Sequence, residues 1–316
     1  DDGDDTGNNY DGTIANVTYD SFLFKPDLVI IKGRETDGKE WGWFDTLRGV
    51  KRMIRSNSTA AEIDYSDGLT EFNNAGFTVG DGGDVNTSGE DYVSYSFKML
   101  DNNNNVPVEM DGGTVDSLVS ANPSAGMSIV KFTNAASGTS TVSHGLSSAP
   151  ELIIMKQTDG TGNWVVYNVN GGAGRTLNIN TTGIYSADNA SAQWGSVPTS
   201  SLFTVTNNSS LTNGSKPHIA YCFHSVSGFS KIGSYTWTGT SYAAGTMVTG
   251  LGFTPSFVMI KSYSAGTDNW FIFDNKRVSG TQSYAIYPNL PDAERTTGHQ
   301  GIIFNSDGFS AGAGAD

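Results

Sequence analysis

A signature that occurs three times constrains the fold of this chain more than any other feature of its sequence. In each copy a lysine follows a proline by six positions, and a tryptophan follows the lysine by eight or nine. A phenylalanine comes 51 to 54 residues after each proline. Such repetition predicts similar modules laid side by side, not one domain built around a single cleft. The landmarks are Pro26, Lys32, Trp41, Phe44, Asp45 and Phe77, then Pro150, Lys156, Trp164, Tyr167, Asn168 and Phe203, then Pro255, Lys261, Trp270, Phe273, Asp274 and Phe309.

The length of the chain agrees with three modules. Its 316 residues exceed what one small core needs, and a module of about 90 to 100 residues can bury a core of its own. Polar stretches rich in Asn and Gly separate the first two copies, whereas the second runs almost directly into the third. We therefore expect an acidic lead-in at 1–13, module 1 at 14–100, a linker at 101–126, module 2 at 127–226 and module 3 at 227–316.

Short apolar tracts predict an all-β chain of tandem β-sandwich-like modules. FKPDLVIIK at 24–32 is rich in β-branched residues, and its proline stands at the strand start, where a missing N–H is tolerated. The tryptophan strand follows, and then a third strand that ends in Asn 16, 16 and 19 residues after its tryptophan. Leading strands are expected at 127–134 and 231–240, before the second and third copies. No segment keeps a 3.6-residue period over three turns.

The third copy looks shorter than the other two. By analogy with them, its closing strand should run to roughly residue 329, about a dozen residues past Asp316. A sandwich without that strand would expose an edge. Either the natural chain continues or another chain supplies the strand, and the sequence favours a truncated third module.

Charge and cysteine content narrow the classes of partner. The net charge of −14 repels polyanions over most of the surface, so nucleic acid and anionic membranes are poor partners. Cys222 is the single cysteine, which excludes an intrachain disulfide. No apolar run approaches the length of a membrane span, so we expect no membrane insertion.

The repeats resemble a module common in tail-fibre-like and other structural proteins of marine bacteriophages. The resemblance rests on GFTVGDGGDVNTSGEDYVSYSF at 76–97 and above all on AYCFHSVSGFSKIGSYTWTG at 220–239. It covers nearly the whole chain after residue 13. Copy two departs from the pattern, with Asn168 in place of Asp and Leu202 where the other copies have glycine. The resemblance implies a virion structural protein, a fibre or receptor-binding component, and brings no catalytic residues with it.

The aromatic residues divide into two groups. The repeated Trp41, Trp164 and Trp270 are expected to be core anchors, because large aromatics dominate core burial, although a sugar-stacking role is the alternative. Outside the repeat, in polar contexts, aromatic side chains are better candidates for an exposed ligand-binding surface. These candidates are Trp194, Trp237 and Tyr242.

The basic residues also have two interpretations. The repeated lysines end buried strands, and we expect them to pair with Asp45, with Asp274 or with a carbonyl, while an acidic ligand is the alternative. A separate basic cluster would suit an anionic glycan or lipopolysaccharide, or else form a solvated strand face or an interface with an acidic subunit. The cluster consists of Arg48, Lys51, Arg52 and Arg55.

Motifs for catalysis or metal binding are not evident. Acidic runs at 1–5, 80–84 and 305–308 resemble calcium loops but do not fit the twelve-residue EF-hand pattern, so Ca²⁺ is a weak alternative to an absence of cofactors. The four histidines are scattered without zinc-ligand spacing. No GxSxG elbow is present. We therefore expect no catalytic residues and no resident metal.

The resemblance, taken with these patterns, implies a non-enzymatic bacteriophage virion structural protein, and we expect a tail-fibre or appendage component that contributes to host-surface attachment. Loops on a rigid strand scaffold can carry recognition, and repeated weak sites gain affinity through multivalency. The expected partners are other copies of the chain, in a trimer by analogy, other virion proteins and host surface glycans. The expected location is the virion, outside cells. The alternatives are a glycan-binding or glycan-degrading tailspike and a cellular adhesin or lectin-like protein.

Overall fold

In the computed structural model the described residues form 25 β-strands and contain no helix. The all-β prediction is thus confirmed. All the strand pairs are antiparallel, as expected where consecutive strands are joined by short Gly- and Asn-rich turns. The described residues are 17–20, 22–101, 106–187, 193–207, 214–236, 245–264, 266–280, 282–296 and 301–312.

Module 1 consists of two sheets that face each other. The larger has the strand order β5-β4-β3-β2-β8, and the smaller has the order β1-β7-β6. Between them lies a core that includes Val29, Phe44 and Phe77. The strands are β1 (Val17–Tyr19), β2 (Leu28–Gly33), β3 (Gly42–Asp45), β4 (Arg52–Arg55), β5 (Ile63–Asp64), β6 (Leu69–Asn73), β7 (Gly76–Val79) and β8 (Tyr92–Phe97).

Module 2 repeats this plan with a wider large sheet. Its order is β16-β15-β14-β13-β18-β11-β10-β9, and β12 pairs with β17 in the smaller sheet. Residues 108–122, which the sequence placed in a linker, form β9 and β10 and extend this sheet. The strands are β9 (Val108–Met110), β10 (Ser117–Asn122), β11 (Met127–Thr133), β12 (Thr139–Ser143), β13 (Leu152–Gln157), β14 (Val165–Asn168), β15 (Arg175–Asn178), β16 (Ser186–Ala187), β17 (Leu202–Thr206) and β18 (Pro217–Phe223).

Module 3 has the same central elements with fewer paired strands. β20 pairs with β21, and β25 lies between β19 and β24. An isolated bridge from Ile272 to Ile286 continues the larger sheet beyond β21. The strands are β19 (Gly245–Val248), β20 (Phe257–Ile260), β21 (Phe271–Asp274), β22 (Val278–Ser279), β23 (Gln282–Ser283), β24 (Ile302–Asn305) and β25 (Gly308–Ala311).

The central strand of each large sheet is apolar on both faces because it serves two cores. In β2, Val29 and Ile31 face the core of module 1, whereas Leu28 and Ile30 face a second core on the other side of the sheet. Side chains alternate between the two faces of a strand, so an uninterrupted apolar run buries both. All six residues of β2 are buried.

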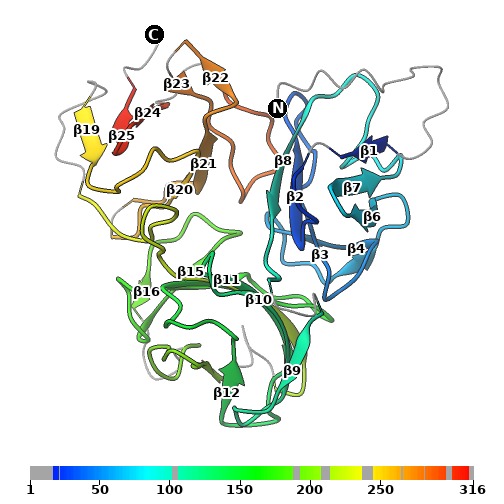
Figure 1. The fold of residues 1–316 in the computed structure, drawn as a ribbon, viewed down its shortest axis with the longest axis vertical. Helices are drawn as coiled ribbons and strands as arrows, with labels where there is room; N and C mark the ends of the chain where they lie inside the picture. The colour runs from blue at the N-terminus through cyan, green and yellow to red at the C-terminus, as the bar shows by residue number, and fades with distance from the viewer. Residues whose placement is uncertain are drawn as a thin grey trace.

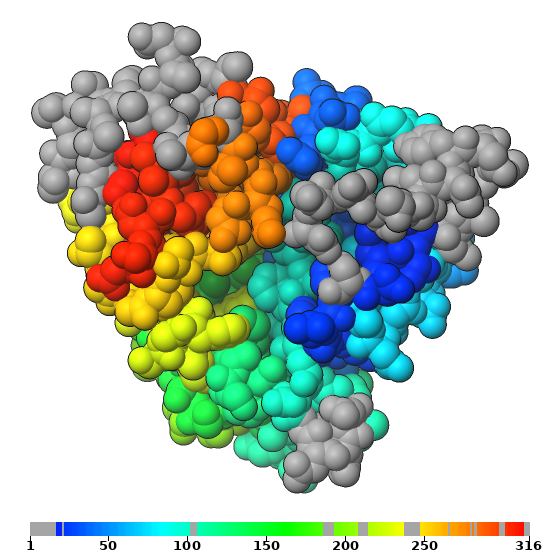
Figure 2. Space-filling model, turned by 45° about the horizontal axis from the view of Figure 1, so that its top comes forward, coloured from blue at the N-terminus to red at the C-terminus, as the bar shows by residue number. Residues whose placement is uncertain are grey.

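The second core is shared by all three modules, which lie around it as three lobes. It brings together Trp41 of module 1, Trp164 of module 2 and Trp270 of module 3, with apolar neighbours from each large sheet. Figure 1 shows module 1 in blue, module 2 in green and module 3 in yellow to red around this centre. On the face shown in Figure 2 the middle is recessed between the lobes. The expected side-by-side modules therefore pack back to back on one common core.

Candidate functional site

The most organised group of polar contacts lies at this common centre, where each repeated tryptophan reaches into a neighbouring module. The indole N–H of each donates to a main-chain carbonyl of the neighbour's third strand tract, two positions before the recurrent Asn of that tract. The bonds run from Trp41 to Tyr287 (2.8 Å), from Trp164 to Arg55 (2.8 Å) and from Trp270 to Asn178 (2.9 Å).

The recurrent asparagines hold the same tryptophans from within their own module. The Oδ1 atom of each Asn accepts the main-chain N–H of the tryptophan of its own copy. The bonds join Trp41 to Asn57 (3.2 Å), Trp164 to Asn180 (2.9 Å) and Trp270 to Asn289 (2.9 Å). The sequence showed that an asparagine recurs after each tryptophan. Only the structure shows that its side chain binds the main chain of that tryptophan.

Together the three contacts close a ring. Module 1 donates to module 3, module 3 donates to module 2, and module 2 donates to module 1. The tryptophans are 0%, 0% and 5% exposed, in agreement with the core-anchor prediction. A buried indole N–H usually finds a hydrogen-bond acceptor, and here the neighbour's carbonyl provides it.

A buried Asp–Arg–Tyr cluster joins module 2 to module 1. The Tyr221 hydroxyl donates to Oδ2 of Asp45 over 2.8 Å, and the Arg48 guanidinium donates to the same oxygen over 2.5 Å. Arg48 also donates to Glu62 over 3.1 Å. Burial raises the pKa of Tyr221 well above its usual range, so the phenol is a neutral donor.

The equivalent cluster joins module 1 to module 3. The Tyr95 hydroxyl donates to Asp274 over 2.8 Å, and Arg277 donates to the same carboxylate over 2.6 Å and to Glu294 over 2.9 Å. Although burial alone would raise it, Arg277 and the hydrogen-bond donors around the carboxylate hold the pKa of Asp274 below its usual range. Sequence reasoning did not single out Tyr95 or Tyr221, because their partners lie far away in the chain, and it also missed Arg277, which lies only three positions after Asp274.

The third position of this pattern is built differently, which explains the departure in copy two. Asn168 stands where the other copies have Asp, and Gly171 stands where they have Arg. The Tyr185 hydroxyl donates to Asn168 over 3.3 Å, and the Tyr185 ring lies 4.9 Å from that of Tyr263. A neutral amide and a local tyrosine thus take the place of the ion pair.

The repeated lysines donate to carbonyls, one of the partners that the sequence left open. Lys32 donates to Gly33 over 2.6 Å, Lys156 donates to Gln157 over 2.8 Å, and Lys261 donates to Thr182 of module 2 over 2.9 Å. Burial lowers the pKa of Lys32 and of Lys156 to about 8. The Lys32 and Lys156 amines are fully buried and so are not placed to hold an acidic ligand from solvent, whereas Lys261 is half-buried.

The predicted basic cluster is largely neutralised by carboxylates. The Arg48 side chain is buried against Asp45, which leaves it unable to meet a glycan, and its contact with Tyr221 lies in an interface between modules. Arg55 pairs with Asp84 at 3.2 Å, and Arg52 approaches Asp64 at 4.0 Å. Lys51 is exposed and has a positive φ of 64°. These four residues therefore do not form one uncompensated cationic surface.

The aromatic candidates for ligand stacking fare differently. Trp194 is 1% exposed and packs edge-on against Tyr167, with ring centroids 5.6 Å apart. It is a core residue of module 2, so the prediction that its ring is exposed was wrong. Trp237 and Tyr242 lie outside the described residues.

Within the described part of the chain, no group of three or more His, Cys, Asp or Glu side chains could hold a metal ion. The Asp307 carboxylate, in one of the calcium-like runs, accepts the N–H groups of Gly250 and Gly252 at 2.9 and 2.6 Å. Cys222 is buried, and burial raises the pKa of its thiol far above the usual range. None of the described residues forms a helix that could cross a membrane.

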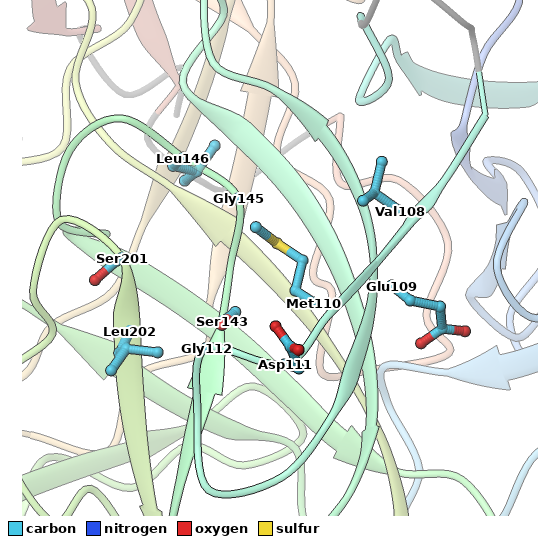
Figure 3. A pocket seen from close by; sticks show the side chains of 10 residues that line it. All are labelled: Val108, Glu109, Met110, Asp111, Gly112, Ser143, Gly145, Leu146, Ser201 and Leu202. Carbon is cyan, nitrogen blue, oxygen red and sulfur yellow. The ribbon is translucent and has the colours of Figure 1, made fainter.

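One open recess of about 440 Å³ lies in module 2, beside β9. Figure 3 shows the Asp111 carboxylate and the Met110 side chain turned toward Ser143 and Gly145, whereas Glu109 projects to the other side. Its lining includes no aromatic residue, so a sugar ring would find no stacking platform. A hydrolytic pair of a glycosidase needs two carboxylates about 5 to 10 Å apart across a groove. In this recess only the Asp111 carboxylate turns toward Ser143 and Gly145.

Residues 6–315 match the family described as "Domain of unknown function (DUF7483)". No curated protein and no solved structure gives a significant match to the chain.

Proposed function

The chain belongs to the DUF7483 family, and we propose that it is a non-enzymatic structural component of a bacteriophage virion, part of a tail fibre or appendage that contributes to host-surface attachment. The observation that carries the proposal is the closed ring of tryptophan contacts among the three modules. Such a ring joins each lobe to both of the others on a shared core, which suits a load-bearing particle component.

The placement of the charged groups supports a mechanical role over a catalytic one. Enzymes use shifted pKa values at groups that substrate can reach. Here the two Asp–Arg pairs that anchor the module contacts are buried, with side chains at most 8% exposed. The two carboxylates accept hydrogen bonds from the hydroxyls of Tyr221 and Tyr95, each of which belongs to the adjacent module.

The assignment to a virion rests on the resemblance of 76–97 and 220–239 to the module of marine phage structural proteins. The acidic surface is compatible with this role, since a net charge of −14 favours solubility and weakens contact with nucleic acid. Attachment would use loops at the outer ends of the lobes, because the inner faces of the large sheets are occupied by the common core.

Purified particles test the proposal. Antibodies raised against the recombinant chain should decorate one defined structure on phage particles in electron micrographs, and the same structure should show the symmetry of its oligomer. Antibody preabsorbed with the chain is the control. If the chain is absent from purified particles and is found in cell envelopes, the cellular adhesin alternative replaces the proposal.

The tailspike alternative has a separate test. Host polysaccharide incubated with the chain should release no reducing sugar if the role is structural. Release that is lost on Asp111→Asn, in the recess beside β9, would overturn the non-enzymatic assignment. Retention of the polysaccharide without cleavage would support attachment.

A further inference from the structure

The two sheets of module 2 differ in width, so the larger one extends past the smaller. The larger sheet has eight strands, whereas the smaller pairs β12 with β17. β9 is the last strand of the larger sheet and pairs with β10 and with no other described strand. The inner face of β9, which is the face toward the smaller sheet, therefore has no strand of that sheet opposite it.

The exposure of the side chains on β9 agrees with this. Val108 lies opposite Val119 of β10, and Val119 belongs to the core between the two sheets. Side chains directly opposite each other share one face of a sheet. Val108 is nevertheless 48% exposed, whereas Val119 is 2% exposed. An apolar side chain on the inner face of β9 is thus open to solvent.

The recess of about 440 Å³ lies at this uncovered face. In Figure 3, Leu146 and Leu202 lie across the recess from Val108. Gly112 and Gly145 also line it, and neither has a side chain that could fill the space. The volume falls within the range of about 300–1,000 Å³ that is usual for ligand sites.

The charges beside the recess have one sign. Asp111 lines the recess and turns toward Ser143, as Figure 3 shows. Glu109 and Asp116 stand before and after it, and residues 106–116 contain no Lys or Arg. Within the described part of the chain, none of these three carboxylates forms an ion pair. A ligand that complements this surface carries a positive charge beside an apolar group.

We propose that this recess binds an extended segment of a partner protein, in which a Lys or Arg comes two positions before an aliphatic residue. The segment would pair with β9 as an antiparallel strand, the mode of recognition known as β-strand addition. This goes beyond the proposed structural role, and it does not depend on whether the chain is part of a virion.

The order of the two side chains follows from the direction of pairing. Side chains at alternate positions of a strand point to the same face, so the partner residues opposite Met110 and Val108 both face the recess. In an antiparallel partner the residue opposite Met110 comes first. A basic side chain there lies beside Asp111, the next residue of the chain, and an aliphatic side chain two positions later covers Val108 and Leu146.

The shape of β9 restricts which segments it can accept. The strand is three residues long and begins directly after Pro107, which has no N–H to donate. Short edge strands and edge prolines limit uncontrolled pairing between proteins. The side chains in the recess must therefore supply most of the specificity. A second copy of this chain is a poor occupant, because its net charge of −14 opposes approach to an acidic recess.

A capped peptide of the sequence Thr-Thr-Lys-Thr-Val-Thr-Thr tests the proposal, with threonine chosen because it favours the extended conformation. Added at millimolar concentration to the isotope-labelled 316-residue chain, it should shift the NMR signals of the Val108, Met110 and Gly145 amides and reach saturation. The same peptide with Glu in place of Lys should bind at least about fivefold more weakly, since it exchanges an attraction for a repulsion.

Charge reversal in the protein locates the contact. Asp111→Lys should weaken binding of the lysine peptide at least about fivefold and should favour the glutamate peptide instead. Asp116→Lys is the matched control, because it changes the net charge equally but lies outside the recess lining. It should weaken binding by less than about twofold at physiological salt, where distant charges are screened.

Three results would overturn the proposal. No saturable shift at β9 with millimolar lysine peptide would show that the recess accepts no such strand. Equal losses in Asp111→Lys and Asp116→Lys would reduce the binding to general attraction by an acidic protein. Signals of β9 that change on dilution of the protein without peptide, together with a dimer in sedimentation, would assign the recess to a second copy of the chain.

Discussion

The indole of Trp41 donates to the carbonyl of Tyr287 across 246 positions of the chain, which joins the first module to the last. Together with the hydrogen bond from Tyr95 to Asp274, this contact closes into a ring what would otherwise be a row of three modules. With it, each module both donates and accepts one tryptophan hydrogen bond. The family match runs across 6–315 and so covers all three lobes and the core that they share.

Replacing Trp164 by phenylalanine tests the energetic weight of one contact in this ring. Trp164→Phe removes the donor to Arg55 and leaves its carbonyl without that partner, so we expect a loss of about 1–3 kcal/mol beyond the change in ring size. Trp194→Phe is the matched control, because Trp194 is equally buried but its Nε1 has no hydrogen-bond partner. Chemical denaturation of both variants measures the difference. Equal losses would contradict the prediction.

Replacing Tyr221 by phenylalanine probes the buried Asp–Arg cluster. Tyr221→Phe takes one donor from the Asp45 carboxylate while keeping the ring, and a hydrogen bond to a charged group contributes about 1.5–3 kcal/mol. We expect the free energy of unfolding to fall by that amount. Tyr167→Phe, at a ring in the core of module 2, should cost less. A Tyr221→Phe variant as stable as the parent would show that the cluster does not hold the modules together.

Gly76 should tolerate no side chain. A Cβ at this position would lie 1.6 Å from the carbonyl oxygen of Tyr19 in β1, and backbone cannot yield as a flexible side chain does. We expect Gly76→Ala to lower the melting temperature by several degrees, with a cost of about 1–3 kcal/mol from overpacking. Gly174→Ala is the control, since a Cβ there meets no atom within 4 Å. A melting temperature unchanged in Gly76→Ala would rule out the close approach of β1.

Acid should destabilise the protein partly through His144. Its Nε2 bonds the Thr199 carbonyl and its Nδ1 accepts the Leu146 N–H, so the folded state holds the neutral ring, and burial lowers its pKa to about 4. The folded pKa is below the unfolded value, so this stabilisation is present above about pH 6.5 and is lost toward pH 4.

In unfolding measurements at each pH, His144→Gln should reduce the slope of stability against pH by about 1.4 kcal/mol per unit in that window. A slope unchanged by His144→Gln would mean that the ring is protonated in the folded state.

Asp27 should stabilise the folded protein at acidic pH, the opposite of the effect of His144. Burial raises its pKa to about 6, although the N–H groups of Met99 and Leu100 donate to its Oδ2 atom over 2.8 Å each. A raised folded pKa contributes stability that is full below the unfolded value near 3.8 and is lost as pH rises through 6. Asp27→Asn removes this contribution, so its stability should fall more steeply than that of the parent between pH 6 and 4. A shallower slope would contradict the raised pKa.

Much of the fold could be predicted because its causes are local. The apolar tract before Lys32 predicts a two-sided buried strand, and the repeated spacing from Pro26 to Trp41 predicts equivalent modules. Both follow from alternation along a strand and from recurrence along the chain.

The central strands of each module and the residues that recur in them could be predicted from the sequence, whereas β9 and β10 were placed in a linker. The contacts of those residues depend on the tertiary structure. Trp164 finds its acceptor 109 positions away and Tyr221 finds Asp45 across 176, and no local pattern encodes a partner at such a distance. The burial of Trp194 was missed for the same reason, because its packing against Tyr167 depends on how two sheets face each other. Local propensity determines which segments form strands, whereas burial of apolar surface in a shared core determines which strands and side chains come into contact.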